Sequence, residues 1–299
     1  MEKSATEYSP DRSRFVAEIS DCTRSMGKDG MNLKARVSEL VEQSGMSPRQ
    51  RLGQSFVVDE LLLGRLIKYA EILPSETVLE IGTGFGFLTE LLSRVAHQVY
   101  TIELDRRLCQ MARELLRGQK NVHLIEGDAL EVSFPEFDKV VSNPPYAISS
   151  DLVFRLLRHT FRSGILTFQT EFARRLVAPS GTPEYGRLTV MVYPKAEVEL
   201  LEEVPRQSFY PTPRVDSTVV RIRLRRSPFT LKDVRMFEEL VRFMFTQRRR
   251  ISKKVVERFV SEHCLSRAAL DEVFKLPQVD RRVYELSPQD FAVMSNALS

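Results

Sequence analysis

The chain has 299 residues, of which 42% are hydrophobic and 28% charged, and its formal net charge is +4. This length and apolar content predict one large or two ordinary folded domains and argue against global disorder. No apolar run approaches the roughly 20 residues that span a bilayer, and the polar N-terminus is unlike a signal peptide. The three cysteines and four histidines are scattered, which indicates reduced thiols in the cytoplasm and neither a disulfide framework nor a metal site.

Residues 1–45 are predicted to form a mobile N-terminal extension that ends in a short amphipathic helix, because apolar residues take helical spacing only between 33 and 41. The next segment, 51–59, is a polar loop that contains a glycine. Asp59 is a good N-cap for a helix over 60–70. Such a loop either simply leads into the helix or folds over a ligand.

A glycine-rich turn separates a strand predicted over 77–81 from a helix predicted over 87–94. Its sequence is Gly82-Thr83-Gly84-Phe85-Gly86. A turn of this kind lets a ligand approach the backbone and places it at the positive end of the helix. The glycines alternate and do not match the spaced dinucleotide fingerprint, so the turn alone does not establish nucleotide binding.

Polar residues end the three strands that follow. The strand predicted over 98–102 ends at Glu103, about 20 residues beyond Gly82, which is the offset at which an acidic side chain binds ribose hydroxyls. The other two end at Asp128 and Asn143. Since the carboxyl ends of parallel strands meet at one edge of an α/β sheet, where ligands bind, we expect these side chains to share a site.

The motif Asn143-Pro144-Pro145-Tyr146 directly follows the strand predicted over 139–142. The two prolines fix their own φ and donate no hydrogen bond, so the turn is stiff and has free carbonyl groups. This arrangement suits an exocyclic amino group. The Asn143 side-chain oxygen and a neighbouring carbonyl would accept its two N–H bonds, while Tyr146 would stack on the ring that carries it. An ordinary proline-rich β-turn is the alternative interpretation.

The α/β alternation is predicted to continue to residue 224, with helices over 150–159 and 171–178 and strands over 164–168, 187–193, 197–204 and 217–224. The last strand alternates apolar and basic residues and is predicted to be half-exposed, with a basic outer edge. Beyond Pro228 only helical patterns occur, over 234–246, 252–260, 267–274 and 288–298. We therefore predict two domains, 46–227 and 228–299, of which the second is all-helical.

Basic residues are concentrated around the predicted domain boundary. Between Arg206 and Arg258 the chain has fifteen Lys or Arg and five Asp or Glu. A solvated charged face would explain any single arginine, but the band as a whole predicts contacts with RNA phosphates. The residues expected to make these contacts are Arg221, Arg223, Arg248, Arg249, Arg250 and Lys253.

Seven motifs occur in the order in which one known family has them. They are Leu52-Gly53-Gln54-Ser55-Phe56, Glu80-Ile81-Gly82-Thr83-Gly84, Ile102-Glu103-Leu104-Asp105, Gly127-Asp128-Ala129, Asn143-Pro144-Pro145-Tyr146, Tyr185-Gly186-Arg187-Leu188 and Phe209-Tyr210-Pro211-Thr212-Pro213-Arg214-Val215-Asp216-Ser217. Together they resemble the S-adenosylmethionine-dependent dimethyltransferases of small-subunit ribosomal RNA, the KsgA type. The resemblance runs from about residue 49 to the C-terminus.

The resemblance implies a class I methyltransferase: a Rossmann-like, mostly parallel seven-stranded sheet with a small helical C-terminal domain. It implies S-adenosylmethionine as cofactor and dimethylation of N6 of two adjacent adenines near the 3′ end of small-subunit ribosomal RNA. The substrate would be a pre-ribosomal subunit late in its biogenesis, and the enzyme a cytoplasmic monomer without a metal.

The resemblance also implies roles for individual residues. Glu103 would bind the ribose hydroxyls and Asp128 the adenine amine of the cofactor, while Asn143 would adjoin both the methionine moiety and the target base. Tyr146 and Phe209 would sandwich that base, and Pro144 would offer its carbonyl. The full cofactor set comprises Gln54, Ser55, Val57, Gly82, Gly84, Glu103, Asp128 and Asn143.

Two positions depart from the family pattern, and two other functions stay open. Pro144 stands where the family usually has Leu or Ile, and Ser55 where it has Asn or His. Asn-Pro-Pro-Tyr also marks enzymes that methylate DNA adenine or release-factor glutamine; the 52–59 loop, the 209–217 segment and the basic C-terminal domain argue against these. A non-catalytic RNA-binding assembly factor of the same fold is the other alternative.

Overall fold

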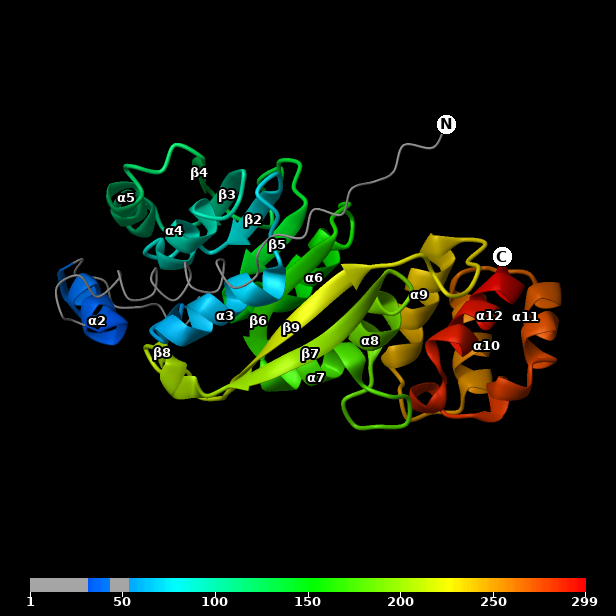
Figure 1. Ribbon diagram of the computed structural model, residues 1–299. Coiled ribbons are helices and arrows are strands. Elements are labelled where there is room, and N and C mark those ends of the chain that lie inside the picture. The colour runs from blue at the N-terminus through cyan, green and yellow to red at the C-terminus, as the bar shows by residue number, and fades with distance from the viewer. Residues whose placement is uncertain (1–31, 44–53) are drawn as a thin grey trace, which may run out of the picture.

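The computed structural model describes residues 32–43 and 54–299, and its centre is a seven-stranded sheet (Figure 1). The order across the sheet is β4 (Val122–Glu126), β3 (Gln98–Glu103), β2 (Thr77–Ile81), β5 (Lys139–Ser142), β6 (Ser163–Gln169), β9 (Ser217–Leu224) and β7 (Ala196–Val204). The first five strands pair in parallel, and β9 is antiparallel to both of its neighbours. The predicted Rossmann-like, mostly parallel sheet is confirmed.

The strand order reverses at the centre of this sheet. From β2 the chain adds β3 and β4 on one side, and then returns to add β5 and β6 on the other. The carboxyl ends of β2 and β5 therefore flank a topological switch point, which is where open α/β sheets bind their ligands. Gly82 follows β2, and Asn143 follows β5, so the two motifs meet there.

Helices cover both faces of the sheet because its central strands are apolar on both sides. Val78 and Leu79 are consecutive in β2, yet both are fully buried and belong to different hydrophobic clusters. The first cluster is packed by α2 (Leu33–Gln43), α3 (Glu60–Ala70), α4 (Phe87–Ser93) and α5 (Arg106–Leu115). The second is packed by α6 (Ser149–Leu156) and α7 (Thr170–Val177).

The predicted N-terminal extension is described only in part. Helix α2 confirms its short amphipathic helix, and Leu33 and Val37 are buried against the first cluster. Residues 1–31 and 44–53 lie outside the described residues, so the mobility of the extension stays a prediction. In the part of the chain that is described, no helix is both long and apolar enough to cross a membrane.

The strand predicted over 187–193 is wrong, because this segment forms helix α8 (Arg187–Val192). Leu188 and Val192 belong to the second cluster of the sheet, whereas Val190 belongs to the core of the C-terminal helices. A short apolar run fits a buried strand and a helix equally well. In a strand these three residues would share one face, whereas in a helix Val190 faces away from Leu188 and Val192. The two cores on opposite sides of the segment therefore require a helix.

The half-exposed strand predicted over 217–224 is also wrong in its exposure. Strand β9 lies between β6 and β7, so it is an interior strand, and its first four residues are buried. Its two arginines, Arg221 and Arg223, both pair with Glu199 on β7, their guanidinium groups lying 2.6 and 3.9 Å from its carboxylate. The basic edge predicted for this strand is therefore partly neutralised within the sheet.

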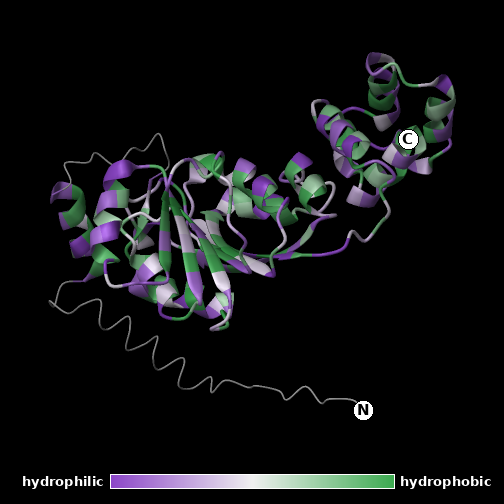
Figure 2. Ribbon diagram, turned by 90° about the horizontal axis from the view of Figure 1, so that it is seen from above, coloured by the Kyte–Doolittle hydropathy of each residue, from purple (hydrophilic) through white to green (hydrophobic). Residues whose placement is uncertain are grey.

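The chain beyond residue 228 forms a group of helices of its own (Figure 2). As predicted, it contains α9 (Val234–Phe245), α10 (Ser252–Glu262), α11 (Arg267–Phe274) and α12 (Pro288–Leu298). Asp233, Ser266 and Ser287 cap three of these helices by accepting a backbone N–H of the first turn. Their core also includes Tyr185 and Val190. A boundary at residue 227 therefore separates residues that pack into the same hydrophobic core.

We expect Tyr185→Phe to lower the free energy of unfolding by about 1–3 kcal/mol. The Tyr185 hydroxyl donates to the carbonyl of Leu286 over 2.6 Å, and both residues are buried, so the variant leaves a buried acceptor without a partner. Urea unfolding measures the change. Tyr193→Phe is the matched control, because Tyr193 is 41% exposed; equal losses in the two variants would contradict the prediction.

Candidate active site

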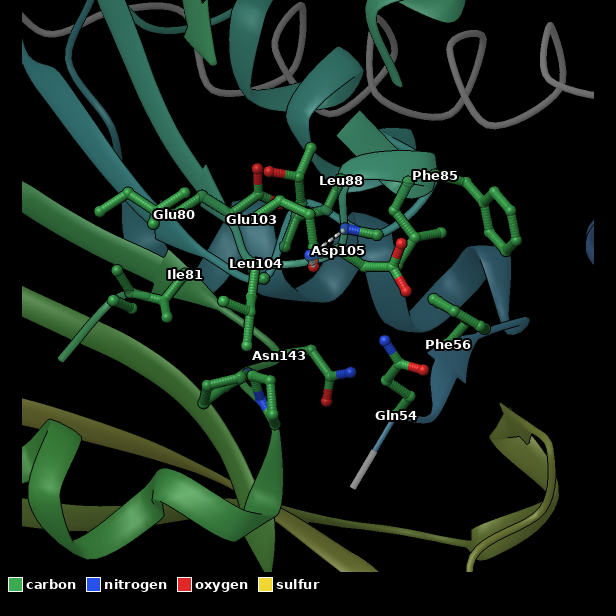
Figure 3. A pocket seen from close by; sticks show the side chains of 18 of the residues that line it. Gln54, Phe56, Glu80, Ile81, Phe85, Leu88, Glu103, Leu104, Asp105 and Asn143 are labelled. Atoms are coloured by element: carbon green, nitrogen blue, oxygen red, sulfur yellow. Dashed lines mark hydrogen bonds between the residues drawn. The ribbon is translucent and has the colours of Figure 1, made fainter. Parts of the chain in front are cut away.

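A cavity of about 800 Å³ opens at the carboxyl ends of β2, β3, β4 and β5, at the switch point (Figure 3). Every residue predicted to hold the cofactor lines it: Gln54, Ser55, Val57, Gly82, Gly84, Glu103, Asp128 and Asn143. Pro144 lines it too. The sequence therefore placed these side chains together correctly, although they come from five separate stretches of chain.

The glycine-rich turn approaches its neighbours closely, so that a side chain there would have to displace them. Gly82 has φ +84°, and a Cβ there would lie 3.2 Å from Cδ of Pro145. Gly84 has φ +56°, and its Cβ would lie 3.2 Å from the ring of Phe56. Both conformations are left-handed and favour glycine. The absence of side chains lets the turn sit against the proline motif and exposes backbone to a ligand in the cavity.

Glu103 connects the end of β3 to the glycine-rich turn. Its two carboxylate oxygens accept from the backbone N–H groups of Gly84, at 3.0 Å, and Asp105, at 2.9 Å. Burial raises the pKa of this carboxyl, while the backbone hydrogen bonds oppose the shift by favouring the charged form. A carboxylate held in this way has its remaining lone pairs directed into the cavity, where they can accept hydrogen bonds from hydroxyl groups.

Glu80 is a buried carboxyl of the site to which the sequence analysis assigned no role. It is 1% exposed and accepts from the hydroxyls of Thr89 and Thr101, at 2.5 and 2.6 Å. Burial raises its pKa to about 8, so the carboxyl is largely protonated at neutral pH. These two hydrogen bonds connect β2 to β3 and α4 next to the glycine-rich turn. An acidic residue inside the apolar run 77–81 was the sequence signal for it.

The side-chain amide of Asn143 is held from one side only. Its Nδ2 donates to the backbone carbonyl of Ser55 over 3.1 Å, whereas its Oδ1 is buried and has no hydrogen-bond partner among the described residues. A buried acceptor without a partner costs about 1–3 kcal/mol, so such atoms are rare and often mark functional sites. In Figure 3 Asn143 extends into the pocket opposite Glu80 and Glu103.

Ser55 contributes to the site mainly through its backbone. Its hydroxyl donates to the carbonyl of Pro211 over 2.8 Å, and its own carbonyl is the partner of Asn143. The residue thus connects the acceptor motif to the 209–217 segment. The hydroxyl has no second hydrogen to give to a ligand, so any cofactor contact through it must use its lone pairs.

The predicted stacking pair, Tyr146 and Phe209, does not flank the pocket. Strand β1 (Phe56–Val57) pairs with β8 (Phe209–Tyr210), and this register sets Phe209 opposite Val57, on the face that is buried in the core. Phe209 is therefore 0% exposed. The Tyr146 hydroxyl is hydrogen-bonded to Ser217 over 2.7 Å, and burial raises its pKa to about 12. Sequence spacing could not reveal that β8 buries the phenylalanine.

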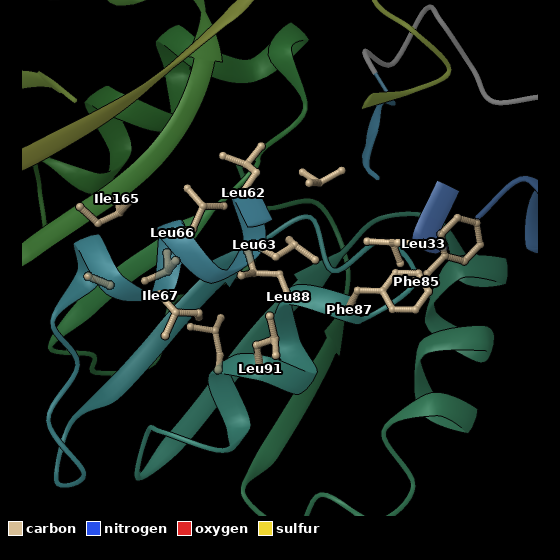
Figure 4. Close-up of a cluster of buried hydrophobic side chains, with 14 of the residues drawn as sticks. Leu33, Leu62, Leu63, Leu66, Ile67, Phe85, Phe87, Leu88, Leu91 and Ile165 are labelled. Atoms are coloured by element: carbon tan, nitrogen blue, oxygen red, sulfur yellow. The ribbon is translucent and has the colours of Figure 1, made fainter. Parts of the chain in front are cut away.

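Apolar lining residues were missed by the sequence analysis. Leu104, between Glu103 and Asp105, lines the pocket and is 55% exposed, which suits a flat ring lying against it. Phe85 also lines the pocket and packs with Phe87 and with Leu33 of α2 (Figure 4). An apolar residue between two acids at a strand end was the signal available for Leu104.

The six predicted RNA-binding residues divide into two groups. Arg221 is bound to Glu199 and to the carbonyl of Tyr69, with its side chain only 14% exposed. Arg248 donates to the carbonyls of Thr182 and Pro183. Both guanidinium groups thus have structural partners, which corrects their expected availability to RNA. The exposed members are Arg223, Arg249, Arg250 and Lys253, of which Arg223 also lies 3.9 Å from the carboxylate of Glu199.

Comparison with known proteins identifies the kind of enzyme to which this site belongs. The family model described as ribosomal RNA adenine dimethylase matches residues 45–295. The chain belongs to this family. Its members carry out S-adenosylmethionine-dependent dimethylation of adenine in ribosomal RNA, and this chain is an rRNA adenine dimethyltransferase.

Individual members of the dimethylase family match over most of their length. The chain is 43% identical to a probable ribosomal RNA small subunit methyltransferase A of Methanosarcina acetivorans, over 82% of this chain and 91% of that protein. Among solved structures, a dimethyladenosine transferase from Plasmodium falciparum matches with a TM-score of 0.71 at 31% identity, over 80% of this chain and 95% of the other. The 23S rRNA methyltransferase ErmE matches with a TM-score of 0.62, also at 31% identity, over 81% of this chain and 99% of the other.

The pocket of this dimethylase fits S-adenosylmethionine on three observations. Gly82 and Gly84 line the pocket, so backbone of the glycine-rich turn faces the ligand there. Glu103 and Asp128 present carboxylates on two neighbouring strand ends, which suit hydroxyl and amino groups. Asn143, at the start of the proline motif, has a side-chain oxygen without a hydrogen-bond partner among the described residues.

We expect Gly82→Ala to weaken the binding of S-adenosylhomocysteine at least tenfold, because the new Cβ meets the proline motif at 3.2 Å. Isothermal titration calorimetry measures the affinity. Gly181→Ala is the matched control: Gly181 has φ +89°, so it bears the same backbone strain, but no atom lies within 4 Å of its Cβ position. A similar loss of affinity in both variants would show that strain, and not the close approach, is responsible.

Proposed function

We propose that this dimethylase modifies small-subunit ribosomal RNA, transferring two methyl groups to N6 of each of two adjacent adenines near the 3′ end, late in subunit assembly. The relatives that match over most of their length are named as small-subunit enzymes, which supports this substrate. The observation that carries the chemistry is the buried, unpartnered Oδ1 of Asn143 beside the proline turn. A monomer acting in the cytoplasm on pre-ribosomal particles is part of the proposal.

The strand ends would hold the cofactor in an extended arrangement along the edge of the sheet. Glu103 would accept hydrogen bonds from the ribose hydroxyls, because its carboxylate is already oriented by two backbone N–H groups. Asp128 would accept from the adenine amine, and Leu104 would lie against the adenine ring. S-adenosylmethionine supplies a methyl group on a sulfonium, which is a good leaving group and needs no acid catalyst.

The acceptor motif would position the target amine without deprotonating it. Adenine N6 is a poor nucleophile because its lone pair is delocalised into the ring. Hydrogen bonds to Asn143 Oδ1 and to the Pro144 carbonyl would favour a pyramidal nitrogen, and would stabilise the positive charge that develops on it. Alignment of reacting groups supplies about 7–11 kcal/mol in favourable cases. The Ser55 carbonyl fixes which end of the Asn143 amide faces the amine.

The target base must leave its stack to reach this motif, and the protein would compensate for part of that cost. Stacking on an aromatic ring is worth about 1–3 kcal/mol per base. Tyr146 directly follows the prolines but does not line the pocket, so stacking on it would require its hydroxyl to leave Ser217. The exposed Arg223, Arg249, Arg250 and Lys253 would bind phosphates of the surrounding RNA.

A labelled-methyl assay distinguishes this proposal from its alternatives. Immature small subunits should accept label, whereas naked DNA and release factor should not. Large-subunit RNA belongs in the same assay, because ErmE, described as a 23S rRNA methyltransferase, shares the fold and 31% identity with this chain. Preferential labelling of large-subunit RNA, DNA or release factor would overturn the proposed substrate, and failure to bind S-adenosylmethionine would favour a non-catalytic assembly factor.

We expect Asn143→Ala to lower turnover at least 100-fold while S-adenosylhomocysteine affinity changes less than threefold. The variant removes the acceptor that orients the amine, an interaction of the reacting state, but leaves Glu103 and Asp128 in place. Single-turnover labelling measures the first quantity and calorimetry the second. Near-normal turnover in this variant would exclude the assigned role of the amide.

We expect the double variant Arg249→Gln/Arg250→Gln to reduce the slope of log affinity against log salt for RNA binding by about 2, one for each lost phosphate contact. Filter binding at several salt concentrations measures the slope. The matched control is Arg267→Gln/Lys275→Gln, which removes the same charge from the start and the C-cap of α11, where both residues are paired with acids of that helix. Equal slopes in the two double variants would argue against a local contact.

A further inference from the structure

Arg155, near the end of α6, reaches across to the loop that begins at Asp128. Its guanidinium donates to the backbone carbonyls of Leu130 and Val132, the latter at 2.6 Å, and lies 4.6 Å from the ring centroid of Phe134. In the described part of the chain no carboxylate is paired with it. The guanidinium therefore acts as a fork of donors of fixed geometry and not as half of an ion pair.

The loop that Arg155 holds determines the orientation of the Asp128 carboxylate. Asp128 Oδ1 accepts from the backbone N–H of Leu130 at 2.8 Å, and its carbonyl accepts from the N–H groups of Glu131 and Val132, both at 2.9 Å. Arg155 binds the carbonyls of Leu130 and Val132. The same two residues thus orient Asp128 through their N–H groups and are themselves oriented through their carbonyl groups.

The helix that carries Arg155 begins at the acceptor motif. Helix α6 starts at Ser149, whose hydroxyl donates to the carbonyl of Tyr146 over 3.0 Å. Leu152 and Leu156 are fully buried and fix the helix in the second cluster. One rigid element is therefore attached at its start to the proposed amine-binding motif and near its end to the loop of Asp128.

We propose that Arg155 is a positioning residue that sets the Asp128 carboxylate for the 6-amino group of the cofactor's adenine, and fixes that end of the cofactor relative to the acceptor motif. The inference rests on the proposed role of Asp128. The two terminal nitrogens of the guanidinium bind the carbonyls of Leu130 and Val132, which lie in one turn. This explains an arginine at this position, because an arginine side chain can donate to two separate acceptors at once. The affinity for the cofactor, and the preference for an adenine that carries a 6-amino group, then depend on a residue that does not line the cofactor pocket.

The test is calorimetry with S-adenosylhomocysteine and with its analogue in which purine replaces adenine, so that the 6-amino group is absent. The wild-type protein should bind the analogue at least tenfold more weakly. In Arg155→Met this ratio should fall to threefold or less. Arg158→Met is the matched control, since Arg158 is an exposed neighbour in the chain just after α6, and it should keep the wild-type ratio.

Two further measurements separate a positioning role from a structural one. Arg155→Met should raise KM for S-adenosylmethionine at least fivefold and leave kcat at saturation within threefold, which a general loss of folded protein would not do. Arg155→Lys keeps the positive charge, but its ammonium group lacks the planar fork of donors and should also lose discrimination. Full discrimination in either variant overturns the inference.

Asp128→Ala distinguishes failure of this inference from failure of the proposed function. If Asp128→Ala abolishes the preference for the 6-amino group while Arg155→Met retains it, the role of Asp128 stands and that of Arg155 is wrong. If Asp128→Ala itself retains the preference, the assignment of Asp128 is wrong and the inference fails with it.

Discussion

The site depends on the orientation of one side-chain amide. Asn143 donates through Nδ2 to the carbonyl of Ser55, and this single bond leaves Oδ1 buried and directed away from any protein donor among the described residues. Ser55 in turn is fixed by its hydroxyl bond to Pro211. The unsatisfied oxygen is a local loss of stability that the surrounding fold tolerates. In the proposed function a substrate amine would recover that loss, so the same atom that lowers the stability of the free protein would favour the bound state.

The acids of the pocket have different roles because their environments differ. Glu80 lies wholly inside the protein, where two threonine hydroxyls surround it and burial raises its pKa to about 8, so it serves as a neutral connection between strands. Glu103 is also buried, and burial raises its pKa too, but the backbone N–H groups of Gly84 and Asp105 oppose this shift by favouring the charged carboxylate. Glu80 thus supports the turn from within, whereas Glu103 is the acid proposed to bind hydroxyl groups.

Much of this arrangement could be predicted from the sequence because it follows from local chemistry. Polar residues at consecutive strand ends must meet at one edge of a parallel sheet, which placed Gly82, Glu103, Asp128 and Asn143 together. Capped helices such as α9, which begins after Asp233, were predicted to within a residue or two. Side-chain partners were not predictable: the six basic residues look alike in the sequence, yet Arg221 and Arg248 have internal partners and Arg249 is exposed.

By itself, the sequence determined the class of fold and which polar residues meet at one edge of the sheet, since spacing and residue type are sufficient for these. The acceptor role of Asn143-Pro144-Pro145-Tyr146 stays a prediction. Only the tertiary structure decided which way each side chain faces. The pairing of β1 with β8 buries Phe209, two hydrophobic cores make a helix of 187–192, and Arg155 meets the Asp128 loop. These outcomes depend on contacts between segments far apart in the chain, about which local periodicity carries no information.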